Sequence, residues 1–101
     1  MSVLVNFAMF PTDKGVSMSP YVARIEKAIQ ATGFPSQLGP MSTVVETPTL
    51  ADALEVLNTA YKALANDCHR VYLTATFDIK DGKDNRMLQK VASVKDKLAK
   101  L

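Results

Sequence analysis

Cys68 and His69 are the only cysteine and the only histidine of this chain, and they stand next to each other. One cysteine and one histidine are too few ligands for a structural zinc site. Neighbouring residues on a strand point to opposite faces, so the pair also lacks the geometry of a cysteine–histidine nucleophile. We interpret Cys68 as a half-buried thiol and His69 as a loop histidine. The sequence therefore predicts neither a catalytic residue nor a metal site at this position.

Other signatures of chemistry are missing or incomplete. Gly33 and Gly39 have neither the spacing nor the lysine of a phosphate-binding loop, and no serine lies in a nucleophile-elbow pattern. Residues 80–85 resemble a calcium loop but lack the glutamate that closes one. We interpret this segment as a solvated turn, with a weak anion site at Lys80, Lys83 and Arg86 as the alternative.

The composition is that of one globular domain over residues 1–101. Of the 101 residues, 48% are hydrophobic and 22% are charged, a balance that excludes wholesale disorder. The net charge of +2 is too small to predict a nucleic-acid partner. No run approaches the roughly 18–20 apolar residues of a membrane helix, and the N-terminus has no signal-peptide pattern. We expect a cytoplasmic protein without membrane contact.

The first part of the chain predicts a strand and a helix. Residues 3–10 are a short β-branched and aromatic run that stops at a proline, as a strand does. Ser19 and Pro20 suit the N-cap and the first position of a helix. Gly33 suits the position just after its end.

The middle of the chain predicts two short strands and a second helix. Residues 34–41 hold two prolines and a glycine, so they form a broken or edge strand, and residues 43–47 form the next strand. Thr49 caps the following helix, with Asp52 three positions on as in a capping box. The apolar stripe predicted for this helix consists of Leu50, Ala53, Leu54, Leu57, Tyr61 and Leu64.

The last part of the chain predicts a long strand and a third helix. Side chains alternate over residues 71–80, with an apolar row from Val71 to Ile79 facing one way. A turn at 81–84 leads to a helix from about Arg86, whose stripe is Leu88, Val91, Val94 and Leu98. The order β-α-β-β-α-β-α predicts an α+β fold, a ferredoxin-like βαββαβ sandwich with an extra C-terminal helix. Its first and third strands lie in the middle of the sheet, and its helices cover one face.

The sheet face that the helices leave bare is where we expect function. A solvated antiparallel face is polar for structural reasons alone, which is the plainer interpretation. Apolar side chains on the same face favour its burial in an oligomer that holds a small polar ligand. The bare face is expected to carry Leu4, Asn6, Ala8 and Phe10, either Val44 and Glu46 or Thr43 and Val45, and then Tyr72, Thr74, Thr76 and Asp78.

An RNA-recognition module shares this topology and stacks bases on aromatic side chains of its two central strands. The corresponding positions here are Asn6, Ala8 and Glu46, with Phe10 only at a strand end. The aromatic and basic signature is missing. We therefore expect no nucleic-acid partner.

Several segments, taken in order, resemble the thiamine-binding protein family. Phe10-Pro11, Val16-Ser17 and Tyr21-Val22 look like the opening of that family. The stretch from Leu38 to Glu46 is similar to its Leu-Gly-Pro-Met-Gly-Thr-Thr-Ile-Glu pattern, with Ser42 and Val44 as departures. Arg70-Val71 and Asp78-Ile79-Lys80 extend the resemblance, which covers roughly Val3 to Leu98.

The resemblance implies a ferredoxin-like chain that assembles as homodimers, often paired into homotetramers. It implies binding of thiamine or its hydroxymethylpyrimidine moiety near subunit contacts, as a carrier or sensor and not as an enzyme. Glu46 matches the glutamate of the family pattern. The aminopyrimidine needs donors and acceptors, and the thiazolium cation favours a carboxylate and an aromatic face. The expected ligand-binding residues are Asn6, Ala8, Phe10, Met41, Thr43, Glu46, Thr74 and Thr76.

Two other functions compete with ligand binding. In the first, the chain is a structural or regulatory homo-oligomer without a small ligand, and its bare face is a protein interface. In the second, it is an enzyme that uses Asp78 or Glu46 as a base. The enzyme hypothesis is the weaker one, because no second acid–base group or nucleophile stands out in the sequence.

Overall fold

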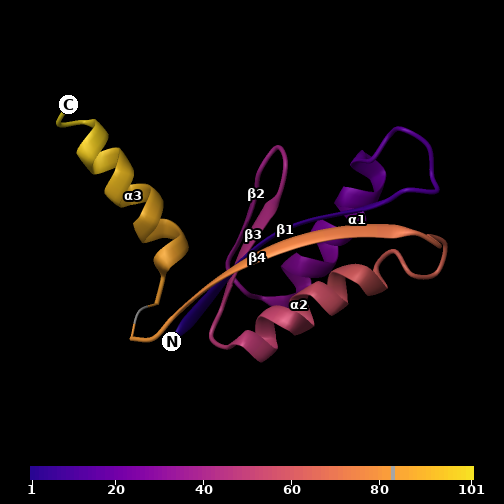
Figure 1. Cartoon of the computed structure of the whole chain (residues 1–101), viewed down its shortest axis with the longest axis horizontal. Helices are drawn as coiled ribbons and strands as arrows, with labels where there is room; N and C mark the ends of the chain where they lie inside the picture. Colours follow the sequence, from indigo (N-terminus) through magenta and orange to yellow (C-terminus); the bar gives the residue numbers. More distant parts are fainter. Residues whose placement is uncertain (83) are drawn as a thin grey trace.

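The computed structural model describes residues 1–82 and 84–101. The predicted turn at 81–84 and the alternative anion site both include Lys83, which lies outside the described residues. The elements, in chain order, are β1 (Ser2–Pro11), α1 (Ser19–Thr32), β2 (Ser36–Leu38), β3 (Thr43–Thr47), α2 (Leu50–Lys62), β4 (Val71–Lys80) and α3 (Arg86–Leu98) (Figure 1).

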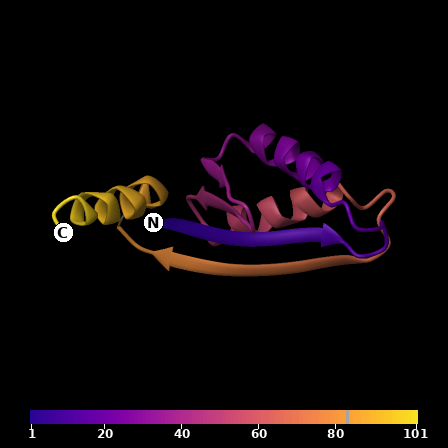
Figure 2. The same ribbon diagram turned by 90° about the horizontal axis from the view of Figure 1, so that it is seen from above.

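The strands form one antiparallel sheet in the order β2-β3-β1-β4. This is the order of a ferredoxin-like fold, so the predicted fold class is confirmed. β1 pairs with β4 from Ser2 opposite Lys80 to Pro11 opposite Val71. In Figure 2, α1 and α2 lie together on one side of the long β1–β4 ribbon.

Alternation along β1 sends every second side chain into the core beneath the two helices. Burying a valine or phenylalanine of this kind contributes about 1.5–3 kcal/mol. The remaining side chains of β1 point to the bare face, as predicted. The core contains Val3, Val5, Phe7 and Met9 of β1, Ile25 and Ile29 of α1, Val45 of β3, and Ala53, Val56 and Ala60 of α2.

α1 begins one residue earlier than predicted. Ser19, expected as the N-cap, is the first helical residue, and Met18 takes the cap position without a side-chain hydrogen bond. Pro20 lies in the first turn, where its missing N–H does no harm. At the other end Gly33 has a left-handed φ of 79°, and its N–H donates to the carbonyl of Gln30. This is the glycine C-cap that the sequence predicts.

α2 has the predicted cap and buries only part of the predicted stripe. The N–H of Asp52 donates to the Thr49 hydroxyl at 3.1 Å, which confirms the N-cap. Ala53 and Leu64 of the predicted stripe are fully buried, and Leu57 is partly buried against the core. The buried residues are Ala53, Val56 and Ala60, whereas Leu50, Leu54 and Tyr61 of the predicted stripe are exposed.

β4 is an edge strand whose helix-side face is covered only in part. The predicted direction of its apolar row is correct, since Phe77 lies opposite the buried Val5. Leu73, Phe77 and Ile79 are nevertheless 43%, 39% and 50% exposed. The reason is that α2 packs mainly on β1 and β3. We call these three exposed side chains the β4 row.

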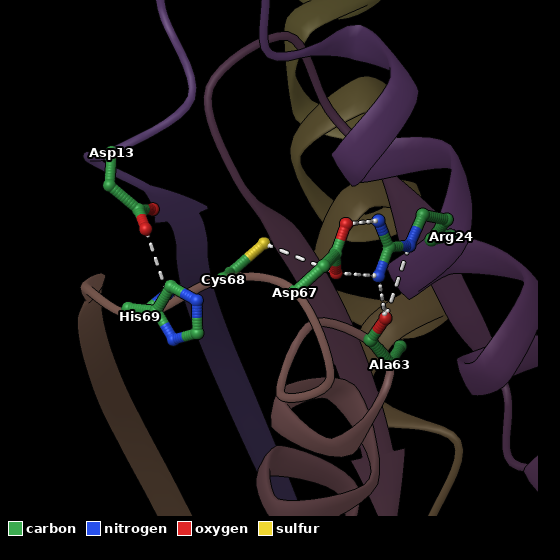
Figure 3. A network of polar contacts seen from close by, with 6 residues as sticks. All are labelled: Asp13, Arg24, Ala63, Asp67, Cys68 and His69. Carbon is green, nitrogen blue, oxygen red and sulfur yellow. Dashed lines mark hydrogen bonds and ion pairs between the residues drawn. The ribbon is translucent and has the colours of Figure 1, made fainter.

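Arg24 of α1 holds the segment that follows α2. Its guanidinium donates to both carboxylate oxygens of Asp67, at 2.7 and 3.1 Å, and to the carbonyl of Ala63, at 2.6 and 3.1 Å (Figure 3). The fork geometry of arginine suits such a two-oxygen contact. The contact therefore connects the two helices at the end where α2 stops.

The segment after α2 has a second tie, to the loop before α1. The Asp13 carboxylate accepts the backbone N–H of His69 at 2.8 Å (Figure 3). Cys68 is 4% exposed and faces the core, and His69 is exposed. Cys68 is thus more deeply buried than predicted, while His69 lies in the loop as expected.

The N-terminus of α3 is held by a carboxylate from another strand. Asn85 precedes the helix with a left-handed φ of 58° and makes no side-chain cap. Glu46 of β3 supplies the acceptors instead: Oε2 takes the N–H of Arg86 at 2.8 Å, and Oε1 takes that of Met87 at 3.1 Å. Burial acts to raise the pKa of Glu46, but these hydrogen bonds and the Arg86 charge outweigh it and lower that pKa.

The Arg86 side chain completes this anchor of α3. It is 4% exposed and donates to the hydroxyl and the carbonyl of Ser2, both at 2.8 Å, and to the carbonyl of Asp78 at 2.7 Å. It also pairs with the Asp78 carboxylate at 3.0 Å. The buried charge is thus fully partnered, as a buried cation must be.

Beyond its first turn, α3 leaves the body of the molecule (Figure 1). The predicted stripe of Leu88, Val91, Val94 and Leu98 is between 44% and 64% exposed. We call this stripe the α3 row. None of the helices in the described residues is long and apolar enough to cross a membrane.

We expect Asp67→Asn to remove an acid-sensitive part of the stability. The hydrogen bonds and charge of Arg24 lower the pKa of Asp67 to about 2, below the value of about 3.9 in an unfolded chain. The carboxylate therefore stabilises the fold above about pH 4, and this contribution is lost as the pH falls through about 2. Urea unfolding of both proteins at several pH values should show their difference in free energy shrinking in that window. Asp81→Asn, at an exposed position, is the control, and a difference that does not change with pH would contradict the assignment.

We expect Glu46→Gln to loosen α3. The amide offers one acceptor and turns a donor toward a backbone N–H, which costs about 1–3 kcal/mol for a buried group. Hydrogen exchange at the Arg86 and Met87 amides should become faster, and the midpoint of urea unfolding should fall. Glu55→Gln on the exposed side of α2 is the matched control. Unchanged exchange at both amides would show that Glu46 does not hold the helix.

Candidate ligand-binding site

A cavity of about 140 Å³ lies beside the part of β1 that β3 does not reach. β3 begins at Thr43, opposite Phe7, so the last residues of β1 have a neighbouring strand only on the β4 side. α1 and the loop between β2 and β3 close over the open side. We call this space the hairpin cavity. Its lining consists of residues 7–10 of β1, Met18, then Val22, Ile25 and Glu26 of α1, and residues 38–43.

Gly39 allows the loop between β2 and β3 to turn beside this cavity. Its N–H donates to the carbonyl of Ser42 at 2.8 Å. A Cβ at this position would lie 3.0 Å from the same oxygen, so a side chain would push the loop apart. Met41, at the tip of the turn, is 87% exposed and lines the cavity. The loop thus presents a large, flexible apolar side chain to solvent at the cavity.

Four of the eight predicted ligand-binding residues line the hairpin cavity: Ala8, Phe10, Met41 and Thr43. The sequence left open whether Thr43 or Val44 faces the bare side of the sheet. Thr43 pairs with the buried Phe7 and is itself 5% exposed, so its side chain faces α1. Thr43 reaches the cavity because the cavity opens at the side of the sheet and takes lining residues from both faces.

The other four predicted residues lie elsewhere. Asn6 and Thr76 are opposite each other on β1 and β4 and line a separate groove on the bare face, beside the first turns of α3. Thr74 is the next bare-face residue of β4, opposite Ala8, and is exposed. Glu46 lies opposite Leu4, with both oxygens bound to the backbone of α3. The structure therefore brings half of the predicted residues together in the hairpin cavity and leaves the other four outside it.

Glu26 is a lining residue that the sequence analysis missed. It follows Val22 by one helical turn, so it lies at the margin of the apolar stripe of α1. A carboxylate at that margin is the signal that could have identified it. The Thr43 hydroxyl donates to Glu26 Oε2 at 3.2 Å. Burial raises the pKa of Glu26, and the hydrogen bond from Thr43 acts in the opposite direction.

The rim of the cavity carries an aromatic pair. Phe10, at the end of β1, lies 5.5 Å from the ring of Tyr72 on β4, with 34° between the ring planes. Tyr72 is 55% exposed. Aromatic faces of this kind attract flat or positively charged ligands.

The described lining of the hairpin cavity can bind a ligand and offers a single acid–base group. Among the described lining residues, Glu26 is the only group that titrates as an acid or base. General acid–base or nucleophilic chemistry needs a second positioned group. Within residues 1–82 and 84–101, no cluster of three His, Cys, Asp or Glu side chains could hold a metal ion.

Solved structures share this architecture. A hypothetical protein from Methanocaldococcus jannascii is 25% identical, with a TM-score of 0.82 over 92% of this chain and 95% of its own. A proposed thiamine biosynthesis/salvage protein from Thermotoga maritima is 20% identical, with a TM-score of 0.80 over 93% and 99% of the two chains. At these sequence identities, the similarity to the two structures establishes a shared fold.

The sequence itself gives the family. A UPF0045 protein of Mycobacterium bovis is 34% identical over 94 residues, which are 93% of this chain and 92% of that protein. A UPF0045 protein of Methanothermobacter thermautotrophicus is 31% identical over 83 residues, or 81% and 84% of the two chains. The sequence model described as thiamine-binding protein matches residues 5–95. This chain therefore belongs to the thiamine-binding protein family.

Proposed function

We propose that this chain binds thiamine, or its hydroxymethylpyrimidine moiety, in the hairpin cavity without converting it, as a carrier or sensor within a homo-oligomer. The observation that carries the proposal is the cavity itself. It contains the Leu38–Thr43 part of the stretch that resembles the family pattern, together with Ala8 and Phe10. Family membership supports a thiamine-related ligand.

The size of the cavity favours one ring of the ligand. A cavity of about 150 Å³ holds a benzene molecule, and the hairpin cavity measures about 140 Å³. The pyrimidine ring would enter between the apolar side chains, and the thiazolium ring would remain near the rim. There the Phe10–Tyr72 pair offers an aromatic face to its positive charge.

The homo-oligomer is proposed from the apolar side chains that one chain leaves exposed. The α3 row is exposed along a helix that extends from the sheet, and the β4 row lies on the edge strand β4, whose outer edge has no neighbour in the described sheet. A long open edge strand is prone to pair with another chain. A second copy related by a two-fold axis would cover the equivalent rows of both chains at once.

The same rows favour the competing function, a structural or regulatory homo-oligomer without a small ligand. The two functions share the assembly and differ in the use of the hairpin cavity. A ligand that stabilises the fold separates them, because only the binding function predicts it.

We expect thiamine or hydroxymethylpyrimidine to raise the melting temperature of the purified protein. A ligand present at 100 times its dissociation constant adds about 2.7 kcal/mol, which is several degrees for a domain of this size. Met41→Ala should reduce the shift, because Met41 lines the cavity. Val16→Ala, at a fully exposed position outside the lining, should leave it unchanged. If neither compound shifts the melting of ligand-free protein, the competing function is favoured.

We expect Val94→Lys to disrupt the assembly. A lysine in the α3 row would place a charge where a second chain removes water. Light scattering should give at least a dimer for the natural chain and a smaller species for the variant. Ser93→Lys adds the same charge to the neighbouring position of α3 and should keep the larger mass. A monomeric natural chain would remove the oligomer from the proposal.

A further inference from the structure

Glu26 is the only charged side chain among the described residues that line the hairpin cavity. The remaining lining is apolar or carries hydroxyl groups, with Phe10, Met18 and Met41 as its large members. Glu26 is half-buried, so its charge is screened less by water than that of a fully exposed carboxylate. What the cavity accepts therefore depends on what this carboxyl group can pair with.

The position of the carboxyl group is fixed from β3. Thr43 is 5% exposed and pairs with Phe7 in the sheet, so its hydroxyl has little freedom. It donates to Oε2 of Glu26 at 3.2 Å. In the described part of the chain, no hydrogen bond reaches Oε1 and no ion pair involves Glu26. Oε2 is thus held by the protein but keeps a free lone pair, and Oε1 is open, so both oxygens can accept hydrogen bonds from a ligand.

Burial raises the pKa of Glu26, which is consistent with a carboxyl group that has no ion pair among the described residues. Such a group binds well to a ring that carries an exocyclic amine beside a ring nitrogen. The amine donates to one oxygen. A single proton shared between the ring nitrogen and the other oxygen forms the second hydrogen bond, whichever side the proton occupies.

We propose that Glu26, oriented by Thr43, is the specificity-determining residue of the hairpin cavity and selects rings with an amine next to a ring nitrogen over rings with a carbonyl in its place. The inference rests on the proposed function for the use of the cavity, and it names the part of the ligand that is recognised. A carbonyl at that position turns an oxygen lone pair toward the carboxyl oxygen, and the amine hydrogen bond is lost.

Calorimetric titration with three probes tests the proposal. The probes are 4-amino-5-hydroxymethyl-2-methylpyrimidine, its 4-oxo counterpart and the benzamidinium ion. Hydrogen bonds to a charged group correspond to about 10- to 100-fold in affinity. The natural chain should therefore bind the amino compound at least tenfold more tightly than the 4-oxo compound.

Two substitutions at position 26 separate the pairing from the charge. Glu26→Leu removes both and should lower the affinity for the amino compound at least tenfold. A leucine at the margin of the α1 stripe leaves the fold intact. Glu26→Gln keeps one acceptor and one donor, so it should restore binding of the neutral amino compound but not of benzamidinium. Thr43→Val should lower the affinity for both the amino compound and benzamidinium. Glu55→Gln on α2 is the control and should leave both affinities unchanged.

The outcomes distinguish this inference from the proposed function. If the natural chain binds the amino compound and Glu26→Leu binds it equally well, the inference is overturned and the proposed function stands. If the natural chain binds the amino and the 4-oxo compounds with equal affinity, the inference is likewise overturned and the proposed function stands. If the natural chain binds neither pyrimidine nor thiamine, the proposed function falls. The benzamidinium titration then decides the inference by itself. If the natural chain binds benzamidinium and the Glu26→Leu variant does not, the carboxylate site is supported. If the natural chain does not bind benzamidinium, the inference is overturned.

Discussion

β1 has ten residues and β3 has five, and the two strands pair only from Val3 to Phe7. This difference in length is the constraint on which the candidate site depends. The second half of β1 keeps β4 on one side and has no strand on the other. The chain fills the gap with α1 and the loop between β2 and β3, which cannot pack as densely as a strand would. A cavity remains at the side of the sheet, lined from both of its faces.

The proposed ligand site and the proposed assembly surfaces lie in different parts of the molecule. The hairpin cavity is lined by one chain at the β2–β3 side of β1. The exposed apolar rows belong to β4 and α3 on the other side of the sheet and beyond its end. Tyr72 is the link between them, since it lies on β4 and touches Phe10 of the cavity. A partner seated on β4 would therefore meet the rim of the cavity through one aromatic side chain.

Much of the fold could be predicted from the sequence because local patterns and tertiary packing agree. The alternation on β1, the Thr49 cap and the Gly33 stop all lie where the pattern indicates. The predicted stripe of α2 is confirmed only in part, because periodicity does not fix which of the adjoining faces of a helix turns toward the sheet. Glu46 shows the same limit for the site: the sequence reveals a carboxylate on the bare face but not the helix terminus that occupies it. Glu26 was missed because its partner Thr43 is distant in sequence.

The labelling rate of the Cys68 thiol measures local opening of the fold around it. Cys68 carries the only thiol of the chain, and burial raises the pKa of that thiol. Cys68 is buried, so a sulfhydryl reagent reacts with it when this part of the chain opens, and the contacts of Arg24 with Asp67 and of Asp13 with His69 oppose that opening. The rate at which Cys68 of the natural protein is labelled then reports the local opening of the segment between α2 and β4. A ligand in the hairpin cavity that rigidifies α1 would slow that rate, because Arg24 lies between the lining residues Val22 and Ile25.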